Sequence, residues 1–507
     1  MRTKIEGISF AVDEHIWGHR LYDEQLPYLT LLEFLGVLAS NIENPLISSP
    51  TDRVQYRPQR QIRLRGLLFN NPYIDSIKTK NLSDDDKWKD WNDLFSQDAT
   101  GYGDNNMDYL RNVFLSFDDF AKAIELLRSS GFEATSNKRW SSKFVFPFGP
   151  DALYEDLRID ANGASNDRRF FARTGEILYL MLSRASNGPE LGKVLVDRLF
   201  NSTSPMNRLI RALQGEPQLA PDSREVGYLP HSKHKRFDQI CDDWLSILSR
   251  DMPVYDALEH LTTNAGLNLL LYFLECAKTQ AGDAEPVEII CEIISRERTK
   301  VRALSCNSYQ ENQALSYRAI RVAVESIKLT EQWESALKTE DPDGECSKIL
   351  YERFQWPSPV GDDEEDYSGS SGEILVQKLV EKAESRHSQH FGKIHSTWSR
   401  AIGLSSRRLS RRIRYAPNDL LLKTMVITIV EDQMQFDEFL NEVHKRYGLV
   451  IGDAEGAHLV KNKQVDQEAL SDNRGNLETR LVGLGLLRRL SDSCSFVENP
   501  FSSKKEI

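Results

Sequence analysis

The residues best suited to chemistry in this sequence are arginines. The stretch SSRRLSRRIRY at 405–415 holds five of them and no acidic residue, although the chain of 507 residues has a formal net charge of −12. Guanidinium groups packed this densely repel one another unless an anion lies against them, and their planar forks match phosphate oxygens. The stretch therefore predicts an anion-facing surface. Nucleic acid fits it as well as a protein partner or self-pairing does, since the acidic face of a partner or the run DDEED at 362–366 could also lie against it. A membrane surface fits it less well.

Helical periodicity extends this surface toward the N-terminus. If 391–414 formed one helix, residues seven apart would line one basic stripe with an apolar back. Gly403, followed by two serines, is a point where that helix could end and a second one begin. The predicted anion-binding residues are Lys393, Arg400, Arg407, Arg408, Arg411, Arg412 and Arg414.

A second set of cations lies near the C-terminus. Helices followed by a terminal hairpin at 486–499 are typical of a winged helix-turn-helix domain, with 473–484 in the recognition-helix position. The secondary candidates in this region are Arg474, Arg480, Arg488 and Arg489. However, 418–501 contains fourteen acidic residues against nine lysines and arginines. A reader of DNA normally carries a basic surface, so we expect this domain to dock on protein.

Motifs that would identify a reaction are absent from the sequence. No GxxxxGK[ST] occurs, and no GxGxxG stands between a strand and a helix, so we expect neither an ATPase nor a cofactor. Two carboxylate groups leave open a divergent metal-dependent nuclease, although neither has the lysine and spacing that a nuclease motif requires. They are Asp151, Glu155 and Asp160, and the cluster His19, Asp23 and Glu24. We expect no metal site.

Other residues with chemical potential have ordinary explanations. Three of the ten histidines, His387, His390 and His395, fall within nine residues but without an HExxH motif, and we expect them to be solvated. The six cysteines are far apart with no C-x-x-C pair, so we expect reduced core or surface thiols. No run of eighteen apolar residues and no signal peptide is present, which predicts a cytoplasmic protein without a membrane segment.

The elements that must position these residues are mainly helices. We predict a mainly α fold with a multi-helical body, a few short strands and a C-terminal winged-helix-like domain. The segment 83–108, rich in Asp, Asn and Gly, predicts a loop or short helices, whereas 285–298 and 311–338 predict helices. The expected domains are an N-terminal mostly helical domain (1–214), a linker or long loop (215–235), a helical domain (236–355), an acidic Pro/Gly/Ser linker (356–373), a helix with the basic stretch (374–415) and the winged-helix-like domain (416–507).

Several longer sequence segments resemble a known protein family. They are GHRLYDEQLPYLTLLEFL (18–35), KFVFPFGPDALYEDL (143–157), FFARTGEILYLMLSRA (170–185), RYGLVIG (446–452) and LVGLGLLRRLSDSCSFVENPF (481–501). Together they resemble an uncharacterised subunit of bacterial anti-phage defence operons, in particular a subunit of the methylation-associated defence system. The phosphorothioation-dependent restriction modules are a looser similarity. No catalytic residue can be carried over, because these phrases contain no catalytic motif.

The resemblance implies a setting in which a methyltransferase, a helicase or other ATPase and a nuclease act together. A chain without nucleotide motifs would then be a non-catalytic accessory or scaffold subunit, docking on those partners and contacting DNA through its basic helix. The alternative is a divergent metal-dependent nuclease subunit of the same kind of system. A transcriptional regulator is disfavoured by the acidity of 418–501.

Overall fold

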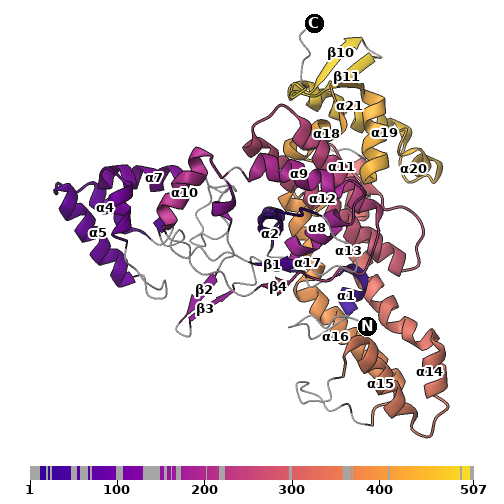
Figure 1. The fold of residues 1–507 in the computed structure, drawn as a ribbon. Coiled ribbons are helices and arrows are strands. Elements are labelled where there is room, and N and C mark those ends of the chain that lie inside the picture. Colours follow the sequence, from indigo (N-terminus) through magenta and orange to yellow (C-terminus); the bar gives the residue numbers. More distant parts are fainter. Residues whose placement is uncertain are drawn as a thin grey trace. The chain divides into compact units, whose positions relative to one another are not determined.

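The computed structural model describes residues 12–18, 21–22, 25–46, 54–57, 67–68, 71–98, 107–129, 149–153, 157–160, 163–166, 173–200, 202–215, 223–295, 300–357, 367, 369–408, 411–491 and 494–502 (Figure 1). The described residues are mainly helical, as the sequence predicts. No described helix combines the length and the apolar character that crossing a membrane requires. The chain divides into two compact units, one of residues 28–179 and 188–226, and a larger one of residues 1–27, 180–187 and 227–507.

The smaller unit consists of helices and two short antiparallel strand pairs, β1 with β4 and β2 with β3. Its elements are α2 (Pro27–Ala39), β1 (Gln55–Tyr56), α4 (Tyr73–Lys78), α5 (Asp84–Asp98), α6 (Tyr109–Val113), α7 (Phe117–Ser129), the 3₁₀ helix η2 (Pro150–Ala152), β2 (Leu157–Asp160), β3 (Gly163–Asn166), most of α8 (Thr174–Ser183), α9 (Gly188–Leu199), α10 (Pro205–Gln214) and β4 (Arg224–Glu225).

Helix α5 corrects the expectation of a loop or short helices at 83–108. Its aromatic residues Trp88, Trp91 and Phe95 recur at helical spacing and are buried against α7 and its neighbours. Three aspartates occupy its first turn, where the helix dipole favours negative charge. The polar composition of the segment therefore marks the solvent-facing side of an amphipathic helix.

The larger unit is organised around one long helix. Its first part contains α1 (Val12–Trp17), α11 (Lys235–Ser249), α12 (Val254–Gln280), β5 (Ile289–Ile290), α13 (Val301–Glu325), the 3₁₀ helix η3 (Ser326–Leu329), α14 (Glu331–Ala336), α15 (Pro342–Phe354), α16 (Gly372–Gln389) and α17 (Phe391–Ala401). Helix α12 is buried along most of its length, and α1, α11, α13 and α17 pack against it. A helix that is buried on all sides needs such neighbours.

The C-terminal part continues with a short hairpin, helices and a three-stranded sheet. The elements are β6 (Ser405–Ser406), β7 (Arg414–Tyr415), α18 (Asp419–Ile429), β8 (Gln433–Gln435), α19 (Phe436–Tyr447), β9 (Leu449–Val450), α20 (Ala457–Lys461), α21 (Gln467–Gly483), β10 (Leu487–Ser491) and β11 (Cys494–Glu498). The sheet has the order β10-β11-β8 and is antiparallel throughout. The terminal hairpin expected at 486–499 is thus present.

Two helix predictions between these parts are wrong. Segment 285–298 contains the strand β5, which pairs in parallel with β9 through the bonds Ile289 N to Gly448 O, 2.8 Å, and Cys291 N to Val450 O, 3.0 Å. Its β-branched apolar residues favour an extended conformation as strongly as a buried helix. Segment 311–338 is divided among α13, η3 and α14, because α13 begins at Val301 and Thr330 caps a new helix.

A buried carboxylate joins three helices of this unit. Asp243 on α11 has no exposed surface, and its Oδ2 accepts hydrogen bonds from Asn264 at 2.8 Å and Asn268 at 3.1 Å on α12. The Tyr447 hydroxyl at the end of α19 donates to the same oxygen at 2.8 Å. Burial raises the pKa of Asp243, and the hydrogen bonds from Asn264 and Tyr447 oppose that rise. The network ties the C-terminal helices to the centre of the unit.

Candidate anion-binding hairpin

The basic stretch at 405–415 is a hairpin at the end of α17. Helix α17 stops at Ala401, and Gly403 adopts a φ of 76°, a conformation that ends helices and favours glycine. Strands β6 and β7 then pair antiparallel, with Ser405 opposite Tyr415 and Ser406 opposite Arg414. The prediction of one helix over 374–415 is therefore wrong at two places, because α16 ends at Gln389 and α17 ends at Ala401. The predicted basic stripe over 391–414 is wrong beyond Ala401. A side chain at Gly403 would also clash with Asn418.

The base of the hairpin is anchored by buried polar groups. Arg414 has no exposed surface, and its Nε donates to the equally buried carboxylate of Glu292, which follows β5. Glu292 also accepts a hydrogen bond from Arg302 Nε of α13 at 2.8 Å. Arg414 therefore anchors the hairpin, and the prediction that it belongs to the anion-binding surface is wrong. A buried arginine with a carboxylate partner is a common way to fix a loop's position.

The next residue, Tyr415, completes the anchor. Its carbonyl accepts from Ser305 Oγ at 2.7 Å and from Glu292 N at 2.9 Å. Its hydroxyl contacts Asn312 Nδ2 at 3.1 Å and His395 Nε2 at 2.7 Å. Burial lowers the pKa of His395 to about 3 and raises the pKa of Tyr415 well above its ordinary value. Both groups are thus neutral, and the hairpin base is held by hydrogen bonds from α13 and α17.

The outer part of the hairpin carries the predicted cations on its surface. Arg407, Arg408, Arg411 and Arg412 are exposed, whereas 409 and 410 lie outside the described residues. Lys393 and Arg400 are exposed on α17, which leads into the hairpin. Arg400 on α17 and Arg407 on the hairpin both act on the buried Tyr309 hydroxyl of α13, where they lower its pKa. Burial nevertheless raises the pKa of Tyr309, against those two charges.

We define the arginine hairpin as residues 400–415 and its outer cations as Arg400, Arg407, Arg408 and Arg411. Within the described part of the chain, none of these four forms an ion pair with a carboxylate. Each guanidinium therefore retains its full capacity for an external anion. Lys393 differs slightly, because its Nζ donates to the Gln389 carbonyl at 2.7 Å.

The secondary candidates in the C-terminal part are all engaged with acidic residues. Arg474 pairs with Asp437, and Arg480 pairs with Asp419 at 2.6 Å. The two arginines of β10 are engaged likewise, Arg488 with Glu498 at 2.8 Å and Arg489 with Glu478 at 2.9 Å. This arrangement makes the C-terminal part a weak competitor for polyanion binding.

The carboxylates of the nuclease alternative do not assemble a site among the described residues. Asp151 accepts from Arg211 at 2.8 Å and from Asn207 at 2.6 Å, which ties η2 to α10. Glu155, His19, Asp23 and Glu24 lie outside the described residues, as does the side chain of Asp160. Across the described ranges, no group of three His, Cys, Asp or Glu side chains has an arrangement that would hold a metal ion.

The expectation that three histidines beside the basic stretch are solvated is wrong for two of them. His387 has no exposed surface and stacks on Trp17 with ring centroids 5.7 Å apart. Its Nε2 lies 2.9 Å from Ser316 Oγ. His395 is buried against Tyr415 as described above. Both histidines fall on the apolar side of their helices, where they act as polar core residues.

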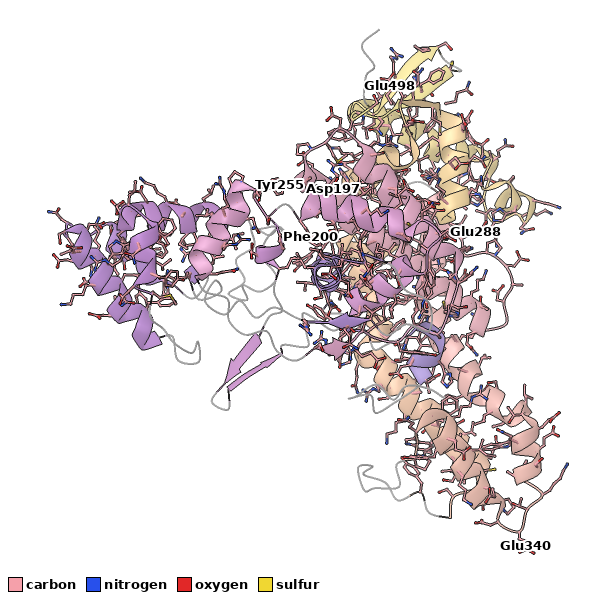
Figure 2. All side chains as sticks on the ribbon, in the orientation of Figure 1. Asp197, Phe200, Tyr255, Glu288, Glu340 and Glu498 are labelled. Atoms are coloured by element: carbon pink, nitrogen blue, oxygen red, sulfur yellow. The ribbon has the colours of Figure 1, made fainter. Side chains whose placement is uncertain are left out.

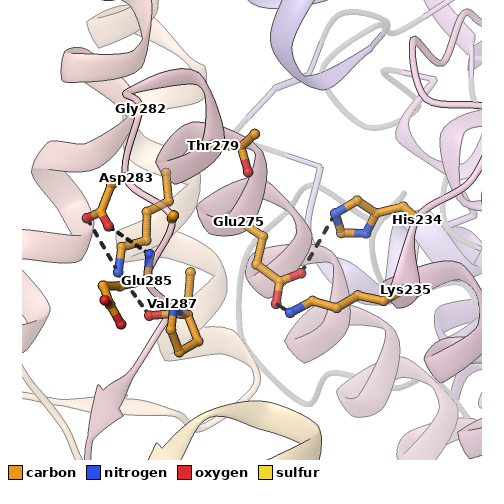
Figure 3. A pocket seen from close by; sticks show the side chains of 11 residues that line it. His234, Lys235, Glu275, Thr279, Gly282, Asp283, Glu285 and Val287 are labelled. Carbon is orange, nitrogen blue, oxygen red and sulfur yellow. Dashed lines mark hydrogen bonds and ion pairs between the residues drawn. The ribbon is translucent and has the colours of Figure 1, made fainter.

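A pocket of about 580 Å³ lies at the C-terminal end of α12 (Figure 3). Two ion pairs lie in its wall: Lys235 is 2.9 Å from the Glu275 carboxylate, and Lys278 is 3.4 Å from Asp283. Burial acts to raise the pKa of Glu275, but Arg236 and Lys235 outweigh it and hold that pKa below its ordinary value. Burial also lowers the pKa of His234 to about 4. We therefore interpret these ion pairs as a network that stabilises the end of α12.

Sequence reasoning missed the residues that hold the arginine hairpin. No sequence motif pointed to Glu292, Ser305 or Asn312. Glu292 lies in the segment 285–298, which was predicted to be helical. One signal was present: an acid within the apolar run VEIICEII must find a cation if that run is buried. The sequence could not reveal that the cation is Arg414, which is 122 positions away.

No protein-family model, no curated protein and no solved structure matches this chain.

Proposed function

We propose that this chain binds the phosphate backbone of nucleic acid through the arginine hairpin, as a non-catalytic accessory subunit. One observation carries the proposal: Arg400 at the end of α17 and three arginines of the hairpin are exposed and have no carboxylate partner among the described residues, beside a hairpin base fixed by a buried ion pair. Phosphate contacts by arginine position a protein on nucleic acid without reading its sequence. Each neutralised phosphate releases counterions, so the affinity should fall steeply with salt.

We further propose that the C-terminal residues 416–507 form a winged-helix-like domain that docks on protein. The proposal is supported by the order α18, β8, α19, α21, β10, β11 and by the sheet order β10-β11-β8. The arginines on α21 and β10 are paired with Asp437, Asp419, Glu498 and Glu478, which speaks against a contact with DNA.

The setting we propose is a bacterial anti-phage defence complex of the restriction type. In that setting the partners are the ATPase or helicase, nuclease and methyltransferase subunits, and the chain bridges them to DNA. The sequence phrases quoted above are the support for this setting, and the paired C-terminal arginines are consistent with a docking role for that region.

The test is the binding of fluorescent duplex DNA, measured by anisotropy across a salt series. For the triple variant R407Q/R408Q/R411Q we expect the slope of log affinity against log salt to fall by about one for each arginine removed. A matched control, K338Q/K461Q/K463Q, removes three exposed cations elsewhere and should leave the slope unchanged. Equal affinity of the wild type and the hairpin variant at low salt would contradict the proposal.

A further inference from the structure

A second charged surface of the larger unit is the counterpart of the arginine hairpin. Residues 326–357, comprising η3, α14 and α15, hold seven acidic residues against four lysines and arginines. Helices α14 and α15 pack side by side, and Glu340 lies at the turn between them (Figure 2). We name residues 326–357 the acidic lobe.

Several carboxylates of the acidic lobe have no cation partner. Glu331, Glu334, Glu340 and Glu352 are exposed, and none of the four forms an ion pair within the part of the chain that the structure describes. The remaining acids have local roles: Glu345 pairs with Lys348, and Asp341 and Asp343 accept backbone hydrogen bonds from Gly344 and Gly372. The distances are 2.5 Å for Glu345 to Lys348, 3.0 Å for Gly344 N to Asp341 and 3.2 Å for Gly372 N to Asp343.

Apolar side chains stand exposed among these carboxylates. Leu329 is 85% exposed, Leu337 54% and Tyr351 42%. Lys328 pairs with Glu373, which brings the chain neighbours Leu329 and Ile374 to the same end of the lobe, and Ile374 is itself 52% exposed. Exposed leucines rimmed by unpaired charge are typical of a protein-binding surface.

We propose that the acidic lobe binds the arginine hairpin of a second copy of this chain. Charge complementarity selects this occupant, because among the described residues four carboxylates of the lobe lack a cation partner and four outer cations lack a carboxylate partner. The two surfaces are different patches of one chain, so the contact is head-to-tail and leaves one lobe and one hairpin open in each dimer. Interfaces of this kind are steered and weakened by salt.

This inference goes beyond the proposed function and shares with it only the premise that the arginine hairpin faces anions. The acidic lobe would occupy the same cations as nucleic acid. Duplex DNA and a second copy of the chain therefore compete for one surface, and DNA releases monomers from the self-associated form.

The experiment is sedimentation velocity of the full chain over a concentration series, at about 0.05 M and about 0.5 M salt. We expect a mass that rises with concentration at low salt and a monomer at high salt. Two neutralised variants, R407Q/R408Q/R411Q on the hairpin and E334Q/E340Q/E352Q on the lobe, should each remain monomeric. The apolar variant L329S/L337S should weaken association about tenfold or more, by analogy with the loss of buried leucines at an interface.

Mixing the two neutralised variants is the decisive measurement. The hairpin variant keeps its lobe and the lobe variant keeps its hairpin, so one intact contact forms between them and should give a discrete species of twice the monomer mass. Circular dichroism of each variant checks that its fold is kept. A wild type that stays monomeric at low salt, or a mixture that stays monomeric while the wild type associates, would overturn the inference.

The outcomes separate the two proposals. Self-association that depends on the hairpin and the lobe, without any binding of DNA, removes only the proposed function. Binding of DNA to a chain that is monomeric at every concentration removes only the further inference. If duplex DNA binds the chain but does not reverse its association, the inference also fails, because the two contacts then lie on different surfaces.

Discussion

Arg414 and Glu292 form an ion pair in which neither side chain has any exposed surface. Glu292 serves a second guanidinium as well, that of Arg302. Burying a single charge without its partner would cost several kcal/mol, so the pair fixes the point at which the arginine hairpin leaves the body. The exposed arginines thus stand on a support that is buried and tightly bonded.

Removing the carboxylate of this pair should destabilise the protein strongly. For Glu292→Ala we expect the free energy of unfolding to fall by about 3–5 kcal/mol, because Arg414 is left buried without a counter-charge. Urea denaturation followed by circular dichroism measures the change. The control is Glu125→Gln, which breaks the surface pair of Glu125 with Lys78 and should cost less than about 1 kcal/mol. Similar losses in both variants would contradict the buried pair.

Asp243 makes the stability depend on pH in a particular direction. Its pKa is raised by burial, so the stability associated with it is complete below the unfolded pKa of about 4 and is lost as the pH rises through the folded value. Asp243→Asn cannot ionise. We therefore expect the free energy of unfolding of the wild type to fall relative to that of the variant as the pH increases from about 4 to 7. A difference that is independent of pH would show that Asp243 titrates normally.

His395 should act in the opposite direction. Burial lowers its pKa to about 3, so the stability it provides is present above the unfolded pKa of about 6.5 and is lost as the pH falls toward 3. His395→Gln retains a donor toward the Tyr415 hydroxyl and does not titrate. We expect the advantage of the wild type over this variant to shrink by up to about 1.4 kcal/mol per pH unit below pH 6.

His444 provides the contrasting control for this titration. A hydrogen bond to Glu288 raises the pKa of His444, so its contribution to stability is present below the unfolded pKa and is lost as the pH rises through the folded value. His444→Gln should therefore change the pH dependence of unfolding with the sign opposite to that of His395→Gln. If both variants shift the profile in the same direction, one of the two environments is misassigned.

The six cysteines should differ in their reactivity toward a thiol reagent. All six lie in the described part of the chain as reduced thiols, and five of them are buried, whereas Cys494 is half-exposed. Burial raises the pKa of Cys276 and of Cys291, which suppresses their reactive thiolate. We expect a thiol reagent to modify Cys494 in the native protein and the other five only after unfolding. In Cys494→Ser the fast phase should disappear, and its persistence would point to local opening of a buried site.

Much of the helical layout follows from the sequence alone. The apolar periods of the sequence predict helices at about 117–130, 205–214, 236–249, 254–279, 418–431 and 436–447. Helices α7, α10, α11, α12, α18 and α19 begin and end within two residues of these positions. The terminal hairpin of β10 and β11 was equally visible as a short apolar alternation with Ser and Asp at its turn. These features depend on neighbours in the chain.

Tertiary structure decided the features that neighbouring residues in the sequence do not determine. Arginines at 407–414 fit a helix and a hairpin equally well by type, and the choice came from Gly403, from Asn418 packed against it and from Glu292, far away in the sequence. Segment 285–298 became extended because β9 offered hydrogen bonds to it. Composition determined that the chain carries a local excess of arginine. Only the fold determined which arginines form ion pairs with carboxylates. Partners such as Arg414 and Glu292 are far apart in the sequence and come together only in the folded chain.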